Sequence, residues 1–500
     1  MEENILVSAK NLMSFLDKNR RSILELLMLE YNLSENDFDR LNILSDIKDF
    51  ILSITGFSQN QPTSRYLDRE ECRGEYFLGN VVWMNRNIGN FYLRDIELSE
   101  NMLVVGRTGT GKTTTVRRIL YEWILKRKPA LIFDWKGDYI SLYNLFRDEE
   151  DFLKYFWVVD PGRGNFKFNP LRIPLNNDRL IVKPITWIEA FIDIFIHSFG
   201  LREASSSILM VALKNVYKKF NIDLYDRRFN ETIFPRLIDL LEMVERYEPL
   251  SGFDRESQRS IIIRLRLLTQ GLLGEMFNTY IGVRLEDIVK RFVIMNLKNI
   301  PLAVNKKFII ECMYGLIYEY VKAINDRSKT KFLFVIEEAH NVLSKHKPDL
   351  EKDILSKPEI CLAELRDFGY GTIIVDQKPS ELSPDAIANT SIKICHALDR
   401  NEDKETMVSA MSLKDYWLNE LNKLDKGYAL VKINREGVKE CFMLKINPIF
   451  PSSTNFEEIF SYKYLDDRSL NFREKNVLKE YSELELNIIR LIGCSKACIY

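Results

Sequence analysis

Cysteine, histidine, glycine and proline are all sparse in this 500-residue chain. The seven cysteines are scattered, odd in number and form no C-x-x-C motif, and the four histidines are too dispersed to build a metal cluster. The 21 glycines and 15 prolines are too few for collagen-like or low-complexity structure. Isolated cysteines in a long chain are typical of reduced thiols, so we expect a cytoplasmic protein without disulfides.

An excess of charge of one sign is also missing, because 71 Lys and Arg face 72 Asp and Glu, a net charge of −1. This balance excludes a wholly basic coat and an acidic tail, but it leaves room for a locally basic channel. No uncharged apolar run reaches the roughly 18 residues of a membrane span, since the longest candidate, 185–200, contains Glu189 and Asp193. The first residues carry two glutamates and no basic segment, so we expect neither a transmembrane helix nor a signal peptide.

The rest of the composition is that of a folded protein of about three units, with 46% apolar and 29% charged residues. The order strand, loop, helix, strand from residue 102 onward predicts an α/β fold with a mostly parallel central sheet. We expect a helical N-terminal region and linker over 1–70, two parts of the core over 71–180 and 291–450, a helical insertion over 181–290, and a helical tail over 451–500.

Apolar runs and helical periodicity give the expected elements. Strands are predicted at 77–83, 90–98, 102–105, 130–133, 292–297, 332–336 and 372–375, with a closing hairpin at 427–433 and 440–446. Helices are predicted at 113–126, 187–199, 204–220, 233–246, 256–273 and 483–492.

A glycine-rich segment follows the strand expected at 102–105 and opens a helix. Its residues fit G-x-x-x-x-G-K-[ST] and are Gly106, Arg107, Thr108, Gly109, Thr110, Gly111, Lys112 and Thr113, with Thr114 next to them. Glycines let successive backbone N–H groups curve around phosphates, Lys112 can reach the β and γ oxygens, and the Thr113 hydroxyl can ligate Mg²⁺. We therefore predict a site for ATP and Mg²⁺; the alternative is a chance glycine-rich turn.

Two adjacent carboxylates, Glu337 and Glu338, end the apolar strand expected at 332–336. A buried parallel strand delivers such residues into the ligand crevice. We expect Glu337 to hold the metal through its water shell and Glu338 to orient and deprotonate the attacking water. The alternative is a strand that simply ends in solvated charges.

Two further strand ends carry polar side chains, Gln377 after 372–375 and Asp134 after 130–133. Gln377 is placed to sense the γ-phosphate or to position water, and Asp134 to reach the same crevice. The alternatives are a loop amide for Gln377 and a cap on the turn at Gly137 for Asp134.

Taken together, these motifs resemble the HerA/FtsK branch of P-loop ATPases, and most of all HerA. The resemblance covers about 76–450 and rests on the segments L-I-F-D-W-K-G-D-Y at 131–139, F-N-P-L at 168–171, V-I-E-E-A-H at 335–340 and E-L-R-D-F-G-Y-G at 364–371. It implies a RecA-like ATPase core and a ring, usually a hexamer, that moves along DNA and works with a nuclease or other DNA-processing partner.

The resemblance also implies that ATP lies between subunits and that Arg366 reaches the γ-phosphate of the neighbour. The alternative is an arginine paired with Asp367 or Glu364 on a helix surface. Lysines after two strand ends are candidate DNA contacts, the alternative being solvated faces; they are Lys298, Lys306 and Lys307, and Lys345 and Lys347 with His346 between them.

The chain departs from the family at its N-terminus, where helical residues stand in place of a β-barrel. Two other functions therefore stay open. One is the motor of a DNA-transfer or secretion machine docked on a membrane complex. The other is a nucleotide switch that does not translocate, which Glu337 in place of the usual Asp favours.

Overall fold

The computed structural model of the chain describes residues 5–6, 9–10, 12–13, 16–34, 36–55, 65–83, 86–147, 150–164, 166–176, 179–202, 204–228, 233–280, 282–327, 330–345, 356–438 and 440–451. The helix expected at 483–492, the tail at 451–500 beyond residue 451, and the candidate DNA contacts His346 and Lys347 lie outside these residues.

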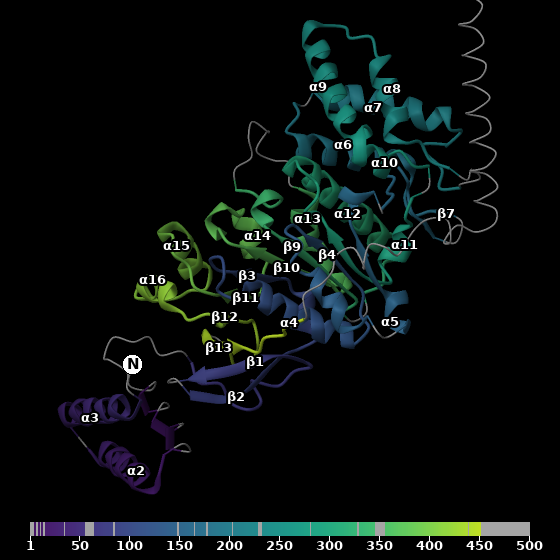
Figure 1. Cartoon of the computed structure of the whole chain (residues 1–500). Helices are drawn as coiled ribbons and strands as arrows, with labels where there is room; N and C mark the ends of the chain where they lie inside the picture. Colours follow the sequence, from purple (N-terminus) through teal and green to yellow (C-terminus); the bar gives the residue numbers. More distant parts are fainter. Residues whose placement is uncertain are drawn as a thin grey trace, which may run out of the picture.

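The core is an 11-stranded sheet in the order β2-β1-β13-β12-β11-β3-β10-β9-β4-β8-β5 (Figure 1). Its strands are β1 Tyr76–Trp83, β2 Arg86–Leu93, β3 Met102–Val105, β4 Ala130–Asp134, β5 Phe156–Val159, β8 Phe292–Asn296, β9 Phe332–Glu337, β10 Tyr370–Asp376, β11 Ile392–Cys395, β12 Tyr428–Lys432 and β13 Phe442–Ile446. The stretch from β11 to β5 is parallel, and the stretch from β11 to β2 is antiparallel. The predicted α/β fold with a mostly parallel sheet is confirmed.

Helices cover both faces of the parallel part. The described α-helices from residue 112 onward are α4 Lys112–Leu125, α5 Glu150–Tyr155, α6 Pro184–Phe199, α7 Ala204–Lys219, α8 Leu237–Glu245, α9 Gly252–Thr269, α10 Gly271–Phe277, α11 Leu285–Ile288, α12 Ala303–Ile324, α13 Lys357–Glu364, α14 Pro384–Ala388, α15 Asn401–Ala410 and α16 Trp417–Glu420. Alternate strand residues face opposite sides. Thus Leu131 and Phe133 of β4 join the cluster with α6 and α12, whereas Ala130 and Ile132 join the cluster with α4.

Helices α6 to α11 follow one another between β5 and β8 in the chain, and α6 to α10 gather at one end of the molecule (Figure 1). The helices expected at 187–199 and 204–220 are present there. The helix expected at 256–273 is divided, because Gln270 has an extended backbone, with φ −116° and ψ 157°, and separates α9 from α10, which begins at Gly271.

The N-terminal helices α2 Lys18–Leu33 and α3 Asp37–Thr55 lie at the opposite end, beyond β1 and β2 (Figure 1). Leu24 and Met28 of α2 pack with Ile47 of α3 and with Trp83 at the end of β1. The other side of α2 exposes four apolar side chains, those of Ile23, Leu26, Leu29 and Leu33. Among the described residues, no helix has both the length and the apolar character needed to cross a bilayer.

One predicted strand was wrong in its position. The strand expected at 90–98 is β2, which ends at Leu93, and Ile96–Ser99 forms a 3-10 helix instead. The chain turns away from the sheet because Glu97 is held by Arg435, with Nε–Oε1 and Nη2–Oε2 distances of 2.6 and 2.7 Å. Sequence reasoning also did not predict β5, β11 and the 22-residue helix α12.

Candidate functional site

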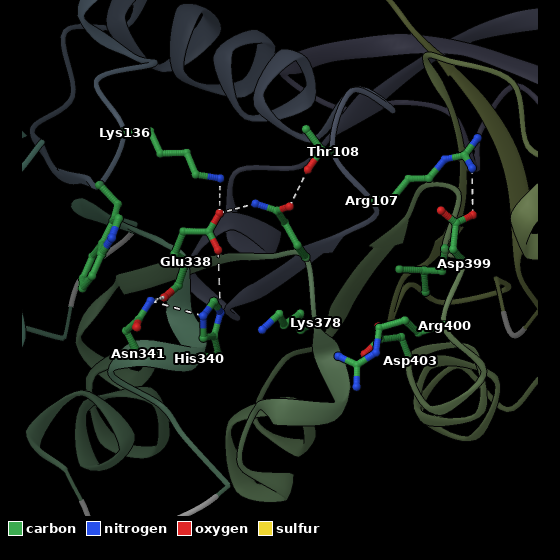
Figure 2. A pocket seen from close by; sticks show the side chains of 13 residues that line it. Arg107, Thr108, Lys136, Glu338, His340, Asn341, Lys378, Asp399, Arg400 and Asp403 are labelled. Atoms are coloured by element: carbon green, nitrogen blue, oxygen red, sulfur yellow. Dashed lines mark hydrogen bonds and ion pairs between the residues drawn. The ribbon is translucent and has the colours of Figure 1, made fainter. Parts of the chain in front are cut away.

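Four neighbouring parallel strands, β3, β10, β9 and β4, end at one edge of the sheet. Their carboxyl ends lead into the phosphate loop, Gln377, the two glutamates and Asp134, so the parallel arrangement brings these residues together. A cavity of about 560 Å³ opens there (Figure 2). It is lined by Arg107, Thr108, Trp135, Lys136, Glu338, His340, Asn341, Gln377, Lys378, Leu398, Asp399, Arg400 and Asp403.

The phosphate loop has the backbone that its glycines permit. Gly106, Gly109 and Gly111 have φ values of +154°, +82° and +124°, and α4 begins at Lys112 directly afterwards. The Lys112 ammonium donates to the carbonyl oxygens of Gly106 at 2.6 Å and Arg107 at 3.0 Å. Burial lowers the pKa of Lys112 to about 8, although the negative charge of Glu338 opposes this. The amine is therefore held over the loop, with its charge destabilised until an anion arrives.

His396 lies beneath this loop, and sequence reasoning did not find it. Its Nδ1–H donates to the carbonyl of Tyr428 at 2.9 Å, which leaves Nε2 to accept from the Thr115 hydroxyl at 2.8 Å. Burial lowers the pKa of His396 to about 4, so the ring is neutral. The neutral histidine ring thus packs under the phosphate loop and supports it.

Glu337 and Glu338 have opposite electrostatic environments. Glu337 is 4% exposed, and burial followed by repulsion from Asp134 raises its pKa to about 8. Burial also pushes the pKa of Glu338 upward, but its hydrogen bond and ion pair with Lys136 outweigh burial, so that its pKa lies below the usual value. Glu338 is therefore an anion in the crevice, as a group that accepts a proton from water must be.

Gln377 links the phosphate loop to Glu338. Its Oε1 accepts from the Thr108 hydroxyl at 2.6 Å, and its Nε2 donates to the Glu338 carboxylate. Glu338 itself has a left-handed backbone, with φ +49°, a conformation that non-glycine residues adopt mainly where surrounding structure enforces it. The structure thus brings three predicted site residues into one hydrogen-bonded chain.

Asp134 caps the turn at Gly137, which is the alternative that we considered for it. Its carboxylate accepts the backbone N–H groups of Gly137, Asp138 and Tyr139 at 2.8–2.9 Å. Burial raises its pKa to about 6 despite these bonds. A role for Asp134 in nucleotide binding stays a prediction.

The donor set fits a divalent cation. Asp134 and Glu337 are both buried, and after burial the charge of Asp134 is what raises the pKa of Glu337, so a nearby positive charge would relieve their repulsion. Glu337 and the Thr113 hydroxyl, at the start of α4, are the oxygen ligands that would hold Mg²⁺, which supplies charge neutralisation to bound phosphates.

Arg366 lies away from this crevice. It belongs to the 3-10 helix Leu365–Phe368 before β10, whereas the crevice follows the end of that strand, about 20 Å away for seven extended residues. Its Nε is 3.8 Å from Asp367, and its side chain is 49% exposed. Within one subunit the arginine therefore cannot act on the nucleotide.

Lys136 and His340 are among the crevice residues for which the sequence predicted no role. The His340 Nδ1 atom lies 2.9 Å from the Asp376 carboxylate; burial lowers the pKa of His340, but Asp376 outweighs burial and raises it. Their positions two residues after the end of β4 and three residues after the end of β9 were the available signal.

The candidate DNA contacts divide into two groups. Lys306 is 7% exposed and packs over the Trp135 ring, and Lys307 donates to the carbonyl of His197 at 3.1 Å, so both point into the protein. Lys298 and Lys345 are exposed.

Comparison with known proteins agrees with the resemblance inferred from the motifs. Residues 76–496 match the family model described as the central domain of helicase HerA. The chain belongs to this family. The predicted HerA-like identity is thereby confirmed.

The relatives of this HerA-family chain and the solved structures that resemble it have low sequence identity to it. It is 22% identical over 367 residues to the DNA double-strand break repair helicase HerA of Sulfolobus acidocaldarius, covering 72% of this chain and 66% of that protein. A probable helicase of Methanocaldococcus jannaschii is 21% identical, with 67% and 60% covered. The chain thus spans slightly less than two thirds of the length of these relatives.

Among solved structures, VirB4 of Thermoanaerobacter pseudethanolicus has a TM-score of 0.58 and 17% identity, covering 77% of this chain and 99% of that one. The bacterial conjugative coupling protein TrwB has a TM-score of 0.52 and 15% identity, covering 78% and 97%. These likenesses confirm the predicted RecA-like fold of the HerA-family core.

Proposed function

We propose that this chain is the ATP-hydrolysing motor of a DNA translocase or helicase of HerA type. It acts in the cytoplasm as a ring, a hexamer by analogy with the family, together with a nuclease or another DNA-processing partner. The observation that carries the proposal is the convergence of the phosphate loop, Glu337, Glu338 and Gln377 at one sheet edge. The relatives named as DNA double-strand break repair helicases support DNA as the partner.

The residues divide the chemistry among them. The loop amides and Lys112 bind the phosphates, and Thr113 with Glu337 holds Mg²⁺, which neutralises charge on the phosphate oxygens. Glu338 accepts a proton from the attacking water, and Gln377 orients that water from its bridge between Thr108 and Glu338. Arg366 completes the site from the neighbouring subunit.

Hydrolysis of ATP by the purified chain, measured with and without single- and double-stranded DNA, tests this function. We expect single-stranded DNA, double-stranded DNA or both to stimulate ATP turnover. Glu338→Gln is the matched control: it keeps nucleotide and DNA binding but loses roughly 10²- to 10⁴-fold in kcat, the contribution of a general base. Turnover that neither form of DNA stimulates would contradict the motor.

A second function, a DNA-transfer motor docked on a membrane complex, is favoured by one observation. Leu26, Leu29 and Leu33 form an exposed apolar stripe on α2, and such stripes mark interaction surfaces. Cell fractionation separates the two functions: membrane association of the full chain that is lost on replacing these leucines by serine supports docking. Fast ATP turnover by the wild-type chain, abolished in Glu338→Gln, would exclude the third function, a nucleotide switch that does not translocate.

A further inference from the structure

Several donor groups converge on the carboxylate of Glu338. The Lys136 ammonium pairs with its Oε1 atom (Figure 2), and the Gln377 side-chain amide donates to the same oxygen. The ammonium groups of Lys112 and Lys136 lie near enough to repel each other, and both are attracted by Glu338. The carboxylate therefore stands where the chain has gathered donors for an anion.

Lys136 has a fixed backbone and an accessible side chain. Its N–H donates to Glu337 at 3.1 Å, and the next three residues are tied to Asp134 through their N–H groups. Its side chain is nevertheless 43% exposed and lines the cavity. Because the backbone of Lys136 is held in place while its long side chain can rotate, the ammonium can exchange one anionic partner for another.

We propose that Lys136 binds the terminal phosphate of the nucleotide triphosphate, and that it leaves Glu338 when it does so. This inference rests on the proposed ATPase function and adds to the phosphate loop a phosphate-binding residue from the turn after β4. In this structure Glu338 is the partner of Lys136. A terminal phosphate carries more negative charge than one carboxylate, so it competes for the ammonium and frees Glu338 to act on water.

The exchange makes Lys136 selective for a third phosphate. A nucleoside diphosphate occupies the loop and Lys112 but has no terminal group to reach Lys136, so the pair with Glu338 persists. The alternative is a permanent tether, in which Lys136 holds Glu338 in place whichever nucleotide is bound. The two differ in the affinity for triphosphate relative to diphosphate.

The test compares the affinity of the full chain, with Mg²⁺, for ADP and for a non-hydrolysable ATP analogue. We expect Lys136→Met to weaken binding of the analogue by about tenfold, the effect of one charge-assisted bond, and binding of ADP by less than about twofold. Lys136→Arg keeps the positive charge and should recover most of the loss. Lys154→Met is the matched control, because the Lys154 side chain is 79% exposed on α5 and its ion-pair partner is Asp151, remote from the phosphate loop in the fold.

Equal losses for both nucleotides, or an unchanged affinity for the analogue, would overturn the inference and leave a tether. A wild-type chain that binds neither nucleotide would overturn the proposed function itself, and this inference with it. The two failures are distinguishable, because one is seen in the wild type and the other only in Lys136→Met.

Discussion

A Cβ atom added to Gly106 would lie 2.6 Å from the Cβ of His396, because the phosphate loop rests directly on that histidine. The same added atom would lie 2.8 Å from the Thr110 hydroxyl oxygen. The conformation of the phosphate loop therefore depends on its packing against His396 as well as on its own glycines.

Gly106→Ala is expected to displace the loop and to weaken ATP binding by about tenfold or more, since backbone strain of 1–3 kcal/mol is typical of such positions. The measurement is a binding titration with ATP and Mg²⁺. Gly252→Ala is the control, because Gly252 opens α9 with no atom within 4 Å of an added Cβ. Normal ATP affinity in Gly106→Ala would mean that His396 yields easily.

His396 is expected to make stability depend on pH. Burial lowers its pKa from about 6.5 to about 4, so between these values the unfolded chain binds the proton and the folded chain does not. This contribution is complete above pH 6.5 and is lost as the pH falls towards 4, on the order of 3 kcal/mol in total. Unfolding measured from pH 4 to 8 should show a smaller loss in His396→Gln. Parallel curves for the two proteins would argue against this role.

Arg366 is expected to act on the site of a neighbouring subunit. Arg366→Ala should bind ATP normally and lose turnover by about 10³-fold or more. Lys112→Ala should also be inactive, because it lacks the loop amine. Mixing the two variants tests the trans arrangement: each supplies what the other lacks, so the mixture should regain activity. A mixture as inactive as its components would count against a shared site.

Arg435 and Glu97 form a buried ion pair, with side chains 1% and 4% exposed. Arg435→Met removes one partner and leaves the carboxylate uncompensated, at an expected cost of about 3–5 kcal/mol in the free energy of unfolding. Arg435→Met combined with Glu97→Gln should recover part of this. Arg73→Met breaks an exposed pair with Glu70 and should change stability by less than about 1 kcal/mol. Thermal unfolding compares the three proteins.

The sequence predicted most of the core strands, though not β5 or β11, and candidate site residues at several strand ends. Strands such as 102–105 and 130–133 are uninterrupted apolar runs bounded by polar residues, a pattern that buried parallel strands impose. It did not predict α12, because every residue from Phe308 to Tyr318 is buried and no polar stripe marks the helix.

The site was predictable only where its residues are neighbours in the chain or end a recognisable strand. Glu337, Glu338 and Gln377 met that condition. His396 did not, because its place under Gly106 arises from the parallel pairing of β11 with β3, which joins segments some 290 residues apart. Lys136 lies three residues after the strand predicted at 130–133, but its partner Glu338 is about two hundred residues away in the chain, and only the fold brings the two together.

The pairing of β1 with β13 joins residues 79–82 to residues 443–446. β1 is the first strand of the sheet in the chain and β13 is the last. Pairing them therefore closes a loop of more than 350 residues, and the entropy lost in closing that loop opposes the pairing. A ribosome must therefore have released the chain as far as residue 446 before β1 and β13 can pair completely. Until then β1 has one uncovered side, and a fragment that stops before residue 442 would offer that side to other strands and invite aggregation.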